Sequence, residues 1–294
     1  MIETLLKKNE YKSLEILSKE ALEGIFHGKH RSILHGFSSE FKEFKSYEQG
    51  ENPRNIDWKL FGKTDKLYTK TYQDETNIKV YFILDISSSM YFPMDTKEKI
   101  NKAIQIIATL ATILQKQKDL FGVIFMSDDL TFESKLGHSL AHLKYIYQAL
   151  EQLVLENTTK KKTGYPDLIK GKIELLGSKK KIYFISDLMF TETENATFIQ
   201  SMLEIKALKN EIEILYILDP SEITIQNSSS NYMNIEDKET DEVLSIHIDN
   251  YKDTLEKMHE LKFENLISKL TQKGIKTHVI SVEQPLINLV KQII

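Results

Sequence analysis

Cysteine is absent from this sequence, and proline, glycine and tryptophan are scarce. The 294 residues include 5 Pro, 11 Gly and 1 Trp. Without cysteine the chain has no disulfides, no thiolate zinc sites and no cysteine nucleophile. The low Pro and Gly content, together with 41% hydrophobic and 28% charged residues, excludes collagen-like and wholly disordered proteins. A chain of this length and composition is expected to bury a substantial core.

A large charge of one sign and long apolar runs are also missing. The formal net charge is -4, so a general nucleic-acid-binding surface is not indicated. No stretch reaches the roughly 20 apolar residues that cross a bilayer, and the first residues lack the apolar segment of a signal peptide. We therefore expect a soluble, cytoplasmic protein without a direct membrane span.

A change of character near residue 77 predicts two parts. Residues 1–77 are expected to form an N-terminal extension, with a helix over 11–23 followed by an extended polar stretch. From residue 78 onward, short apolar runs alternate with helical patterns, which indicates a parallel sheet flanked by helices. The expected fold class is therefore α/β, a doubly wound, mainly parallel sheet over residues 78–294, with the extension packed against it.

The periodicity of apolar residues predicts the individual elements of the second part. Strands are expected at 78–84, 121–126, 130–133, 181–185, 212–218 and 275–280, and helices at 140–155, 167–176, 196–208, 251–272 and 285–294. Asp95 and Glu98 resemble a capping box that opens a further helix, whose apolar residues recur at three-to-four-residue spacing from 100 to 114. Gly274 suits the left-handed position after the 251–272 helix.

One polar segment breaks this alternation. Residues 219–250 contain the run NSSSN at 227–231 and are acidic over 236–242. We interpret the segment as an insertion with a flexible tip, with a hairpin through 223–226 and 243–248. A solvated loop without a role is the alternative.

Oxygen-bearing side chains follow two of the expected strands. Asp85, Ser87 and Ser89 alternate directly after the first strand, so their side chains can converge on one point. The carboxyl ends of strands in an α/β sheet are where ligands bind. A carboxylate with two hydroxyls suits Mg²⁺ or Mn²⁺, and Asp187 adds a second carboxylate if its strand is a neighbour. The alternative is that these residues only cap backbone N–H groups at helix starts.

These residues carry a family resemblance. The segment FILDISSSM at 82–90 resembles the metal-ion-dependent adhesion motif of von Willebrand factor type A domains, and ISD at 185–187 resembles the later strand-end Asp of that family. The resemblance implies that Asp85, Ser87 and Ser89 hold Mg²⁺ and that Asp187 acts mostly through water.

The middle loop of that family contributes a Thr ligand, and here the sequence departs from the pattern. The segment GYPDL at 164–168 places Pro166 where the Thr is expected. Thr163 lies close by and is the substitute ligand that we expect. Asp167 is another candidate.

The N-terminal part narrows the resemblance. The run RNIDW at 54–58, with YEQG at 47–50, is similar to bacterial proteins of the family of unknown function DUF58, in which such a run precedes a von Willebrand-type domain. The resemblance implies a MoxR-type AAA+ ATPase as partner, in chaperone-like complex assembly or remodelling. Arg54 and Asp57 are expected to pair, and Trp58 to anchor the segment on the core.

Other chemistries find less support in the sequence. GKT at 62–64 ends like a P-loop, but Asp57 stands where a P-loop needs glycine. No G-x-S-x-G and no H-E-x-x-H motif is present. We expect a non-enzymatic, metal-ion-dependent protein-interaction module. The alternative is a Mg²⁺- or Mn²⁺-dependent hydrolase that uses Asp85 and Asp187 around the same ion.

Overall fold

The chain divides into two compact units. In a computed structural model, one unit is Gly28–Asn77 and the other combines Met1–His27 with Ile78–Ile294. The structure describes residues 14, 15, 18, 22, 41–48, 53, 56–72, 78–155, 169, 176–223, 232–236, 243–247 and 263–294. The division between 77 and 78 coincides with the change of sequence character, whereas residues 1–27 group with the α/β unit rather than with the expected extension.

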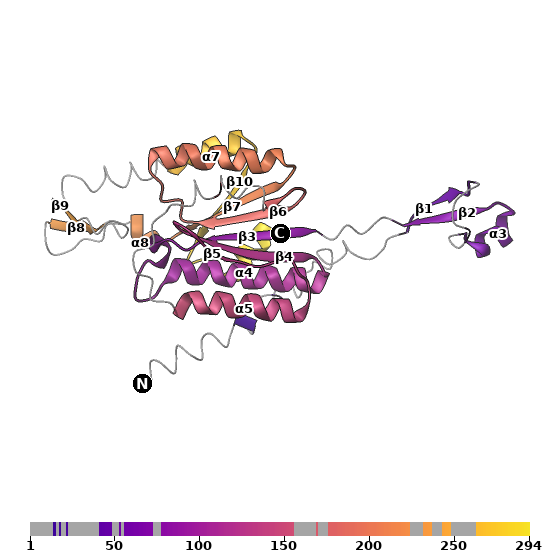
Figure 1. The fold of residues 1–294 in the computed structure, drawn as a ribbon, viewed down its shortest axis with the longest axis horizontal. Helices are drawn as coiled ribbons and strands as arrows, with labels where there is room; N and C mark the ends of the chain where they lie inside the picture. Colours follow the sequence, from indigo (N-terminus) through magenta and orange to yellow (C-terminus); the bar gives the residue numbers. More distant parts are fainter. Residues whose placement is uncertain are drawn as a thin grey trace. The chain divides into compact units, whose positions relative to one another are not determined.

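Six strands form the central sheet of the larger unit (Figure 1). They are β3 Lys79–Asp85, β4 Leu120–Met126, β5 Leu130–Glu133, β6 Lys181–Ser186, β7 Glu211–Leu218 and β10 Lys276–Ser281. Their order is β10-β7-β6-β3-β4-β5, and every neighbouring pair is parallel except β4 with β5. This is the doubly wound order, in which the direction of winding reverses between β3 and β6. The predicted fold class is confirmed.

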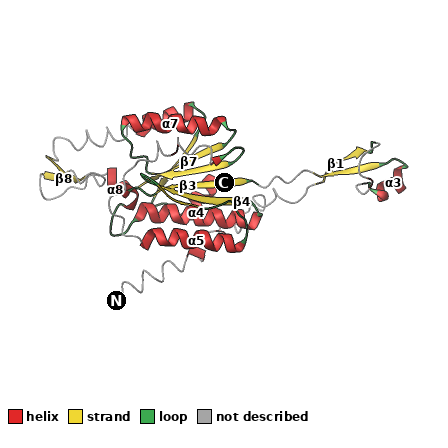
Figure 2. Ribbon diagram, in the orientation of Figure 1, coloured by secondary structure: helices red, strands yellow, loops and turns green. Residues whose placement is uncertain are grey.

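Helices cover both faces of this sheet (Figure 2). Helices α4 Glu98–Gln117 and α5 Leu140–Leu155 lie on one side, and α7 Glu192–Ala207 lies on the other. The C-terminal helix α10 Leu286–Ile293 packs against α4. Because α4 has both the sheet and α5 as neighbours, it is buried on most of its surface, including the predicted apolar residues from Ile100 to Ala111.

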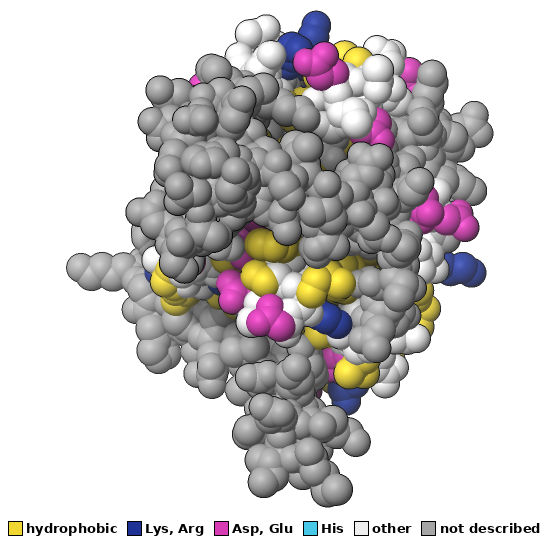
Figure 3. Space-filling view, turned by 90° about the vertical axis from the view of Figure 1, so that its left-hand side faces the viewer, with side chains coloured by type: hydrophobic (Ala, Val, Ile, Leu, Met, Phe, Trp, Pro, Cys, Tyr) yellow, Lys and Arg dark blue, Asp and Glu magenta, His cyan; other side chains and the backbone are white. Residues whose placement is uncertain are grey.

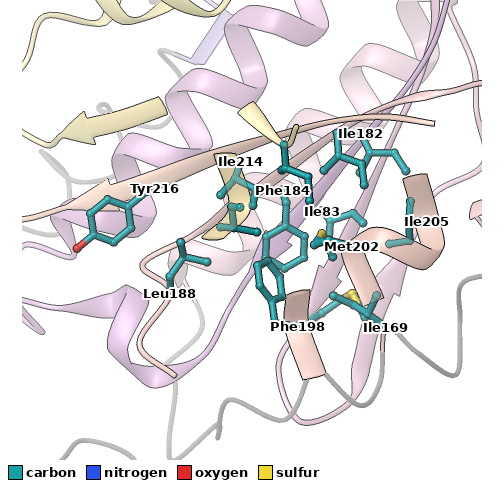
Figure 4. Close-up of a cluster of buried hydrophobic side chains, with 14 of the residues drawn as sticks. Ile83, Ile169, Ile182, Phe184, Leu188, Phe198, Met202, Ile205, Ile214 and Tyr216 are labelled. Atoms are coloured by element: carbon teal, nitrogen blue, oxygen red, sulfur yellow. The ribbon is translucent and has the colours of Figure 1, made fainter. Parts of the chain in front are cut away.

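The hydrophobic core on the α7 side comes from β3, β6, β7 and α7 (Figure 4). Phe198 of α7 lies at its centre, with ring centroids 5.1 Å from Phe184 and 5.0 Å from Phe190. Burying one large apolar side chain contributes about 1.5–3 kcal/mol. This packing fixes β6 against α7 and so fixes the residues that follow β6.

The predicted capping box at α4 is wrong. The residue before α4 is Lys97, which has a φ of 54° and makes no side-chain cap hydrogen bond. Its backbone N–H donates to the carbonyl of Pro93 at 2.6 Å, so a turn leads into the helix and Asp95 is not in the capping position. The observed capping box is at α7, where Thr191 and Glu194 bond reciprocally. It starts α7 four residues before the predicted start.

The insertion contains a hairpin, although not the predicted one. Strand β8 Tyr232–Glu236 pairs antiparallel with β9 Val243–His247. The predicted second strand, 243–248, corresponds to β9. Of the predicted first strand, 223–226, residue 223 belongs to the short helix α8 Pro220–Ile223, and residues 224–226 lie outside the described residues. Pro at the first position of a helix is favoured, since its missing N–H has no partner there in any case.

The other predicted elements agree with the structure within one or two residues where they are described. Gly274 has the expected positive φ of 69°. Three predicted helices are described only in part, and their described residues are helical. These residues are 14, 15, 18 and 22 of the 11–23 helix, 169 and 176 of the 167–176 helix, and 263–272 of the 251–272 helix. Within the described part of the chain, none of the helices combines the length and the apolar character that crossing a membrane requires.

The described part of the smaller unit contains a two-stranded antiparallel sheet and one helix. Strand β1 Phe41–Ser46 pairs with β2 Tyr68–Tyr72, and α3 Trp58–Thr64 lies between them in the chain. Asp57 caps α3, since its carboxylate accepts the backbone N–H groups of Lys59 at 2.9 Å and Leu60 at 3.1 Å. Arg54, its expected partner, lies outside the described residues.

Trp58 does not serve as a buried anchor within this unit. Its side chain is 61% exposed, and its ring meets Phe61 edge-on at a centroid distance of 6.1 Å. Ile56 is the buried residue of the motif, and it forms a backbone bridge with Thr69. Within this unit Ile56 rather than Trp58 is buried, and the anchoring of the segment on the α/β core by Trp58 stays a prediction.

Candidate metal centre

The candidate site lies at the carboxyl ends of β3 and β6. These strands are direct neighbours, with Leu84 opposite Ile185 in the parallel register. The neighbourhood that the sequence analysis required for Asp85 and Asp187 is therefore present. It coincides with the point where the winding of the sheet reverses, which is where open α/β sheets bind their ligands.

Asp85, Ser87 and Ser89 converge as predicted. The Ser87 backbone N–H donates to Asp85 Oδ1 at 2.8 Å, and the hydroxyl oxygens of Ser87 and Ser89 are 3.1 Å apart. Ser87 has an extended backbone and precedes the short 3-10 helix η3 Ser88–Tyr91. This turn carries both hydroxyls toward one another after the strand ends. Asp85 and Ser87 are buried, and Ser89 is partly exposed.

Ser186 is a site residue that sequence reasoning missed. Its hydroxyl donates to Asp85 Oδ2 at 2.8 Å and accepts the Leu188 backbone N–H at 2.8 Å. Both oxygens of Asp85 are thus oriented, one by Ser87 and one by Ser186. A carboxylate has about four acceptor positions, and three hydrogen bonds from Ser87 and Ser186 act on Asp85, so acceptor capacity remains for a ligand. A Ser directly before a strand-end Asp was the signal in the sequence.

Asp187 is held by a lysine that the sequence analysis also missed. Lys99 Nζ donates to Asp187 Oδ2 at 2.7 Å and to Glu222 Oε1 at 2.5 Å. The Lys99 side chain is 0% exposed. On its other oxygen, Asp187 accepts the Met189 N–H at 3.4 Å. Lys99 therefore connects the start of α4 with the residues that follow β6 and β7.

Acidic groups outnumber basic ones at this edge of the sheet, among the residues that the structure describes. Asp187 and Glu222 pair with Lys99, while Asp85 lies within the charge of Asp187 and Asp219 within that of Glu222. Burial raises the pKa of Asp85 to about 7, and the charge of Asp187 adds to that rise, while hydrogen bonds from Ser87 and Ser186 oppose it. A surplus of buried negative charge is the electrostatic condition that favours a bound cation.

The pKa values of Glu222 and Lys99 follow the same logic. Burial raises the pKa of Glu222, and Lys99 offsets part of that rise. Burial alone would lower the pKa of Lys99, but Asp187 and Glu222 outweigh it and raise that pKa. The ammonium group is therefore held in its charged form inside the protein.

The donor set fits a small divalent cation. Two oxygens at adjacent corners of a Mg²⁺ octahedron lie about 2.9 Å apart, because the Mg–O distance is about 2.05 Å. The 3.1 Å between the Ser87 and Ser89 hydroxyls is close to that separation. The part of the chain that the structure describes holds no group of three or more His, Cys, Asp or Glu arranged for a metal. The donors that lie together here are the hydroxyls of Ser87 and Ser89 and the carboxylate of Asp85.

The predicted middle-loop ligand stays a prediction. Thr163 and Asp167, like Pro166, lie outside the described residues. The loops that are described carry exposed apolar side chains, with Met94 47% and Met189 48% exposed. Figure 3 shows the end of the molecule that bears α8, where hydrophobic side chains gather beside acidic and basic ones.

The family model of the DUF58 proteins, described as "protein of unknown function DUF58", matches residues 43–262. That match covers 220 of the 294 residues, so the chain belongs to the DUF58 family. Uncharacterized proteins from Mycobacterium tuberculosis and Mycobacterium bovis are 26% identical to it over 99 residues. This region is 34% of the chain, and it spans 31% of the length of each of those curated relatives. The predicted resemblance to DUF58 is confirmed.

Solved structures with a similar fold include two from Bacteroides. The conserved hypothetical protein BatB from Bacteroides thetaiotaomicron is 14% identical, with 74% of this chain and 97% of that chain covered and a TM-score of 0.45. An aerotolerance-related membrane protein from Bacteroides fragilis is 17% identical, with coverages of 74% and 96% and a TM-score of 0.46. The SpRpn10 VWA domain is 13% identical, with coverages of 74% and 95% and a TM-score of 0.40.

Proposed function

We propose that this DUF58 protein is a non-enzymatic module that docks a protein partner through a divalent metal ion, Mg²⁺ or Mn²⁺. The observation that carries the proposal is the convergence of Asp85, Ser87 and Ser89 at the reversal point of the sheet, with two hydroxyls at the spacing of metal ligands. Crevices at this place in doubly wound sheets are the usual ligand sites.

Each residue has a distinct part in holding the ion. Ser87 and Ser89 offer neutral hydroxyl oxygens, and Asp85 offers one carboxylate that Ser186 keeps oriented. Asp187 supports the site through water, and Thr163 is the expected ligand from the middle loop. When bound, a divalent ion would supply a centre of positive charge at the end of the sheet. With few anionic ligands it retains net positive charge, which favours a carboxylate from a partner.

The partner that we propose is a MoxR-type AAA+ ATPase, in chaperone-like assembly or remodelling of complexes in the cytoplasm. This step rests on membership of the DUF58 family and on what the sequence resemblance implies about that family. The exposed Met94 and Met189 would add apolar contact around the charged centre. An apolar contact beside a defined charge pair gives a small interface specificity.

A binding measurement with three proteins tests the docking proposal. Wild type, Asp85→Ala and Asp128→Ala are immobilised, and binding of the purified ATPase is measured with Mg²⁺ and again with EDTA. Asp128 is a matched control, because it is an exposed acid just beyond the neighbouring strand β4. We expect Asp85→Ala and EDTA to abolish binding alike, and Asp128→Ala to leave it unchanged. Binding that survives both treatments would refute metal-dependent docking.

One observation favours a hydrolase, although one that acts without a bound metal rather than the metal-dependent alternative. A carboxyl group with its pKa raised to about 7 is tuned for general-base catalysis at neutral pH, and Asp85 is such a group. A bound cation would remove this property, because it stabilises the ionised form. Screening generic phosphate and ester substrates with Mn²⁺ and again with EDTA separates hydrolysis, with or without metal, from binding alone. Turnover that disappears in Asp85→Ala would overturn the non-enzymatic proposal.

A further inference from the structure

Lys99 stands in a position that ordinary rules disfavour. It is the second residue of α4, where the partial positive charge of the helix N-terminus repels a cation. It is also completely buried, which lysine tolerates only when it is paired. Both costs are borne at the edge of the candidate metal centre. Residues that break local rules in this way are expected at functional sites.

The hydrogen bonds of Lys99 explain what it is paired with. Its ammonium is 2.7 Å from Asp187 and 2.5 Å from Glu222, and neither acid belongs to its own helix. Asp187 is the carboxylate that would support the metal, and one of its two oxygens is already taken by Lys99. The proposed docking reaction makes no use of Lys99 itself.

We propose that Lys99 is a resident counter-ion, which competes with the divalent metal for the negative charge of Asp187 and so keeps the affinity for the metal low. The inference rests on the proposed metal site and adds its regulation. An ammonium and a divalent ion attracted to the same carboxylates repel one another. Solvent and salt screen that repulsion little, because the groups are buried. Stable occupancy by metal then depends on a further carboxylate, which a docked partner brings.

Glu222 is expected to affect metal affinity in the opposite direction to Lys99. Glu222 shares the ammonium of Lys99 with Asp187, so that Lys99 neutralises Asp187 less. The negative charge of Glu222 also lies beside Asp187 and Asp219 at this edge of the sheet. Loss of the Glu222 charge leaves Lys99 committed to Asp187 and makes the site more positive. Loss of the Lys99 charge makes the site more negative. The two changes are therefore expected to move metal affinity in opposite directions.

Titration with Mn²⁺ tests this, with free Mn²⁺ followed by electron paramagnetic resonance in the absence of any partner. The proteins are wild type, Lys99→Met, Glu222→Gln and Lys102→Met. Lys102 is the matched control, since it lies one turn further along α4 and donates to the Gln284 carbonyl at 2.9 Å. Thermal unfolding of each protein shows that it is folded.

We expect Lys99→Met to bind Mn²⁺ about tenfold more tightly than wild type or better, which corresponds to about 1.4 kcal/mol. We expect Glu222→Gln to bind Mn²⁺ several-fold more weakly. We expect Lys102→Met to stay within about twofold of wild type, because solvent and salt screen the effect of a charge that lies farther from the site. If Lys99→Met does not fold, two other results carry the test. Glu222→Gln should bind Mn²⁺ more weakly than wild type, and the double variant Lys99→Met/Glu222→Gln should bind it more tightly than Glu222→Gln.

The outcomes separate this inference from the docking proposal. Affinity that is unchanged or weaker in folded Lys99→Met overturns the counter-ion role and leaves metal-dependent docking intact. Binding by Lys99→Met without detectable binding by wild type supports the counter-ion role and is compatible with metal-dependent docking, because the wild type then needs the carboxylate of the partner. Absence of Mn²⁺ binding in all four folded proteins overturns both.

Discussion

Replacement of Asp85 by Asn should stabilise the metal-free protein, and the gain should grow with pH. Asp85 is fully buried and its pKa is raised from 3.8 to about 7, first by burial and then by Asp187. When the pKa of an acid is higher in the folded than in the unfolded state, the protein loses stability as pH rises between those two pKa values. The cost is absent below pH 3.8 and complete above pH 7, where it reaches about 4 kcal/mol.

The structure sets the expected size of the effect. In Asp85→Asn the new side chain would keep an oxygen acceptor for one of the two groups that bond Asp85, and the Ser186 hydroxyl can turn to accept from the new amide. Between about pH 5 and pH 8 the stabilisation by Asp85→Asn should therefore increase by about 2–3 kcal/mol. Urea unfolding with EDTA at both pH values measures it, and Asp128→Asn is the exposed control.

Mg²⁺ supplies the second half of this prediction. The ion should restore the stability of wild type at about pH 8, by about 1.4 kcal/mol at roughly ten times its dissociation constant, and should leave Asp85→Asn unchanged. A stability difference between wild type and Asp85→Asn that is the same at both pH values would refute the electrostatic reasoning. Equal stabilisation of both proteins by Mg²⁺ would place the ion elsewhere.

Three further predictions concern the rest of the chain. Burial would raise the pKa of Glu213, but hydrogen bonds with His278 and Lys181 lower it to about 2, so Glu213→Gln should cost about 1–3 kcal/mol at about pH 7, and the cost should vanish as pH falls from 4.5 toward 2. Phe198→Ala should lower the free energy of unfolding by about 3–5 kcal/mol in urea titrations, because it empties the centre of a packed cluster. Trp58→Ala should change stability by less than about 0.5 kcal/mol, and iodide should quench the fluorescence of Trp58 readily; a blue-shifted, protected emission would contradict its exposure.

The strands and the first half of the site were open to prediction because their signals are local. The apolar run before Asp85 and the alternation of Asp85, Ser87 and Ser89 are contained in a few consecutive residues. Parallel pairing then places strand ends at one edge without further information. Asp187 needed one additional assumption, that its strand is a neighbour, and the register confirms it.

Lys99 was not predictable, because its partners are remote in the sequence. Asp187 is 88 residues away and Glu222 is 123 residues away, and the helical pattern around Lys99 allows it to be a solvated residue. The capping prediction failed for a different reason. Asp95 and Thr191 both begin a plausible motif, and only the path of the chain before each helix decides which one caps. Trp58 shows that a large aromatic ring does not by itself indicate burial.

The strand order has a consequence for the stage of folding at which the candidate site forms. Ile78 finds its partner Asp119 only 41 residues along the chain, whereas Asp85 and Ser186 are 101 residues apart. Closing the longer loop costs about 0.8 kcal/mol more entropy, and slow steps in folding are those that join distant segments. The β3–β4 pair is therefore expected to form before β6 joins it. A chain that is still being synthesised, or whose sheet is misassembled, would lack the site. A partner that binds at the site would therefore bind only molecules whose sheet is complete.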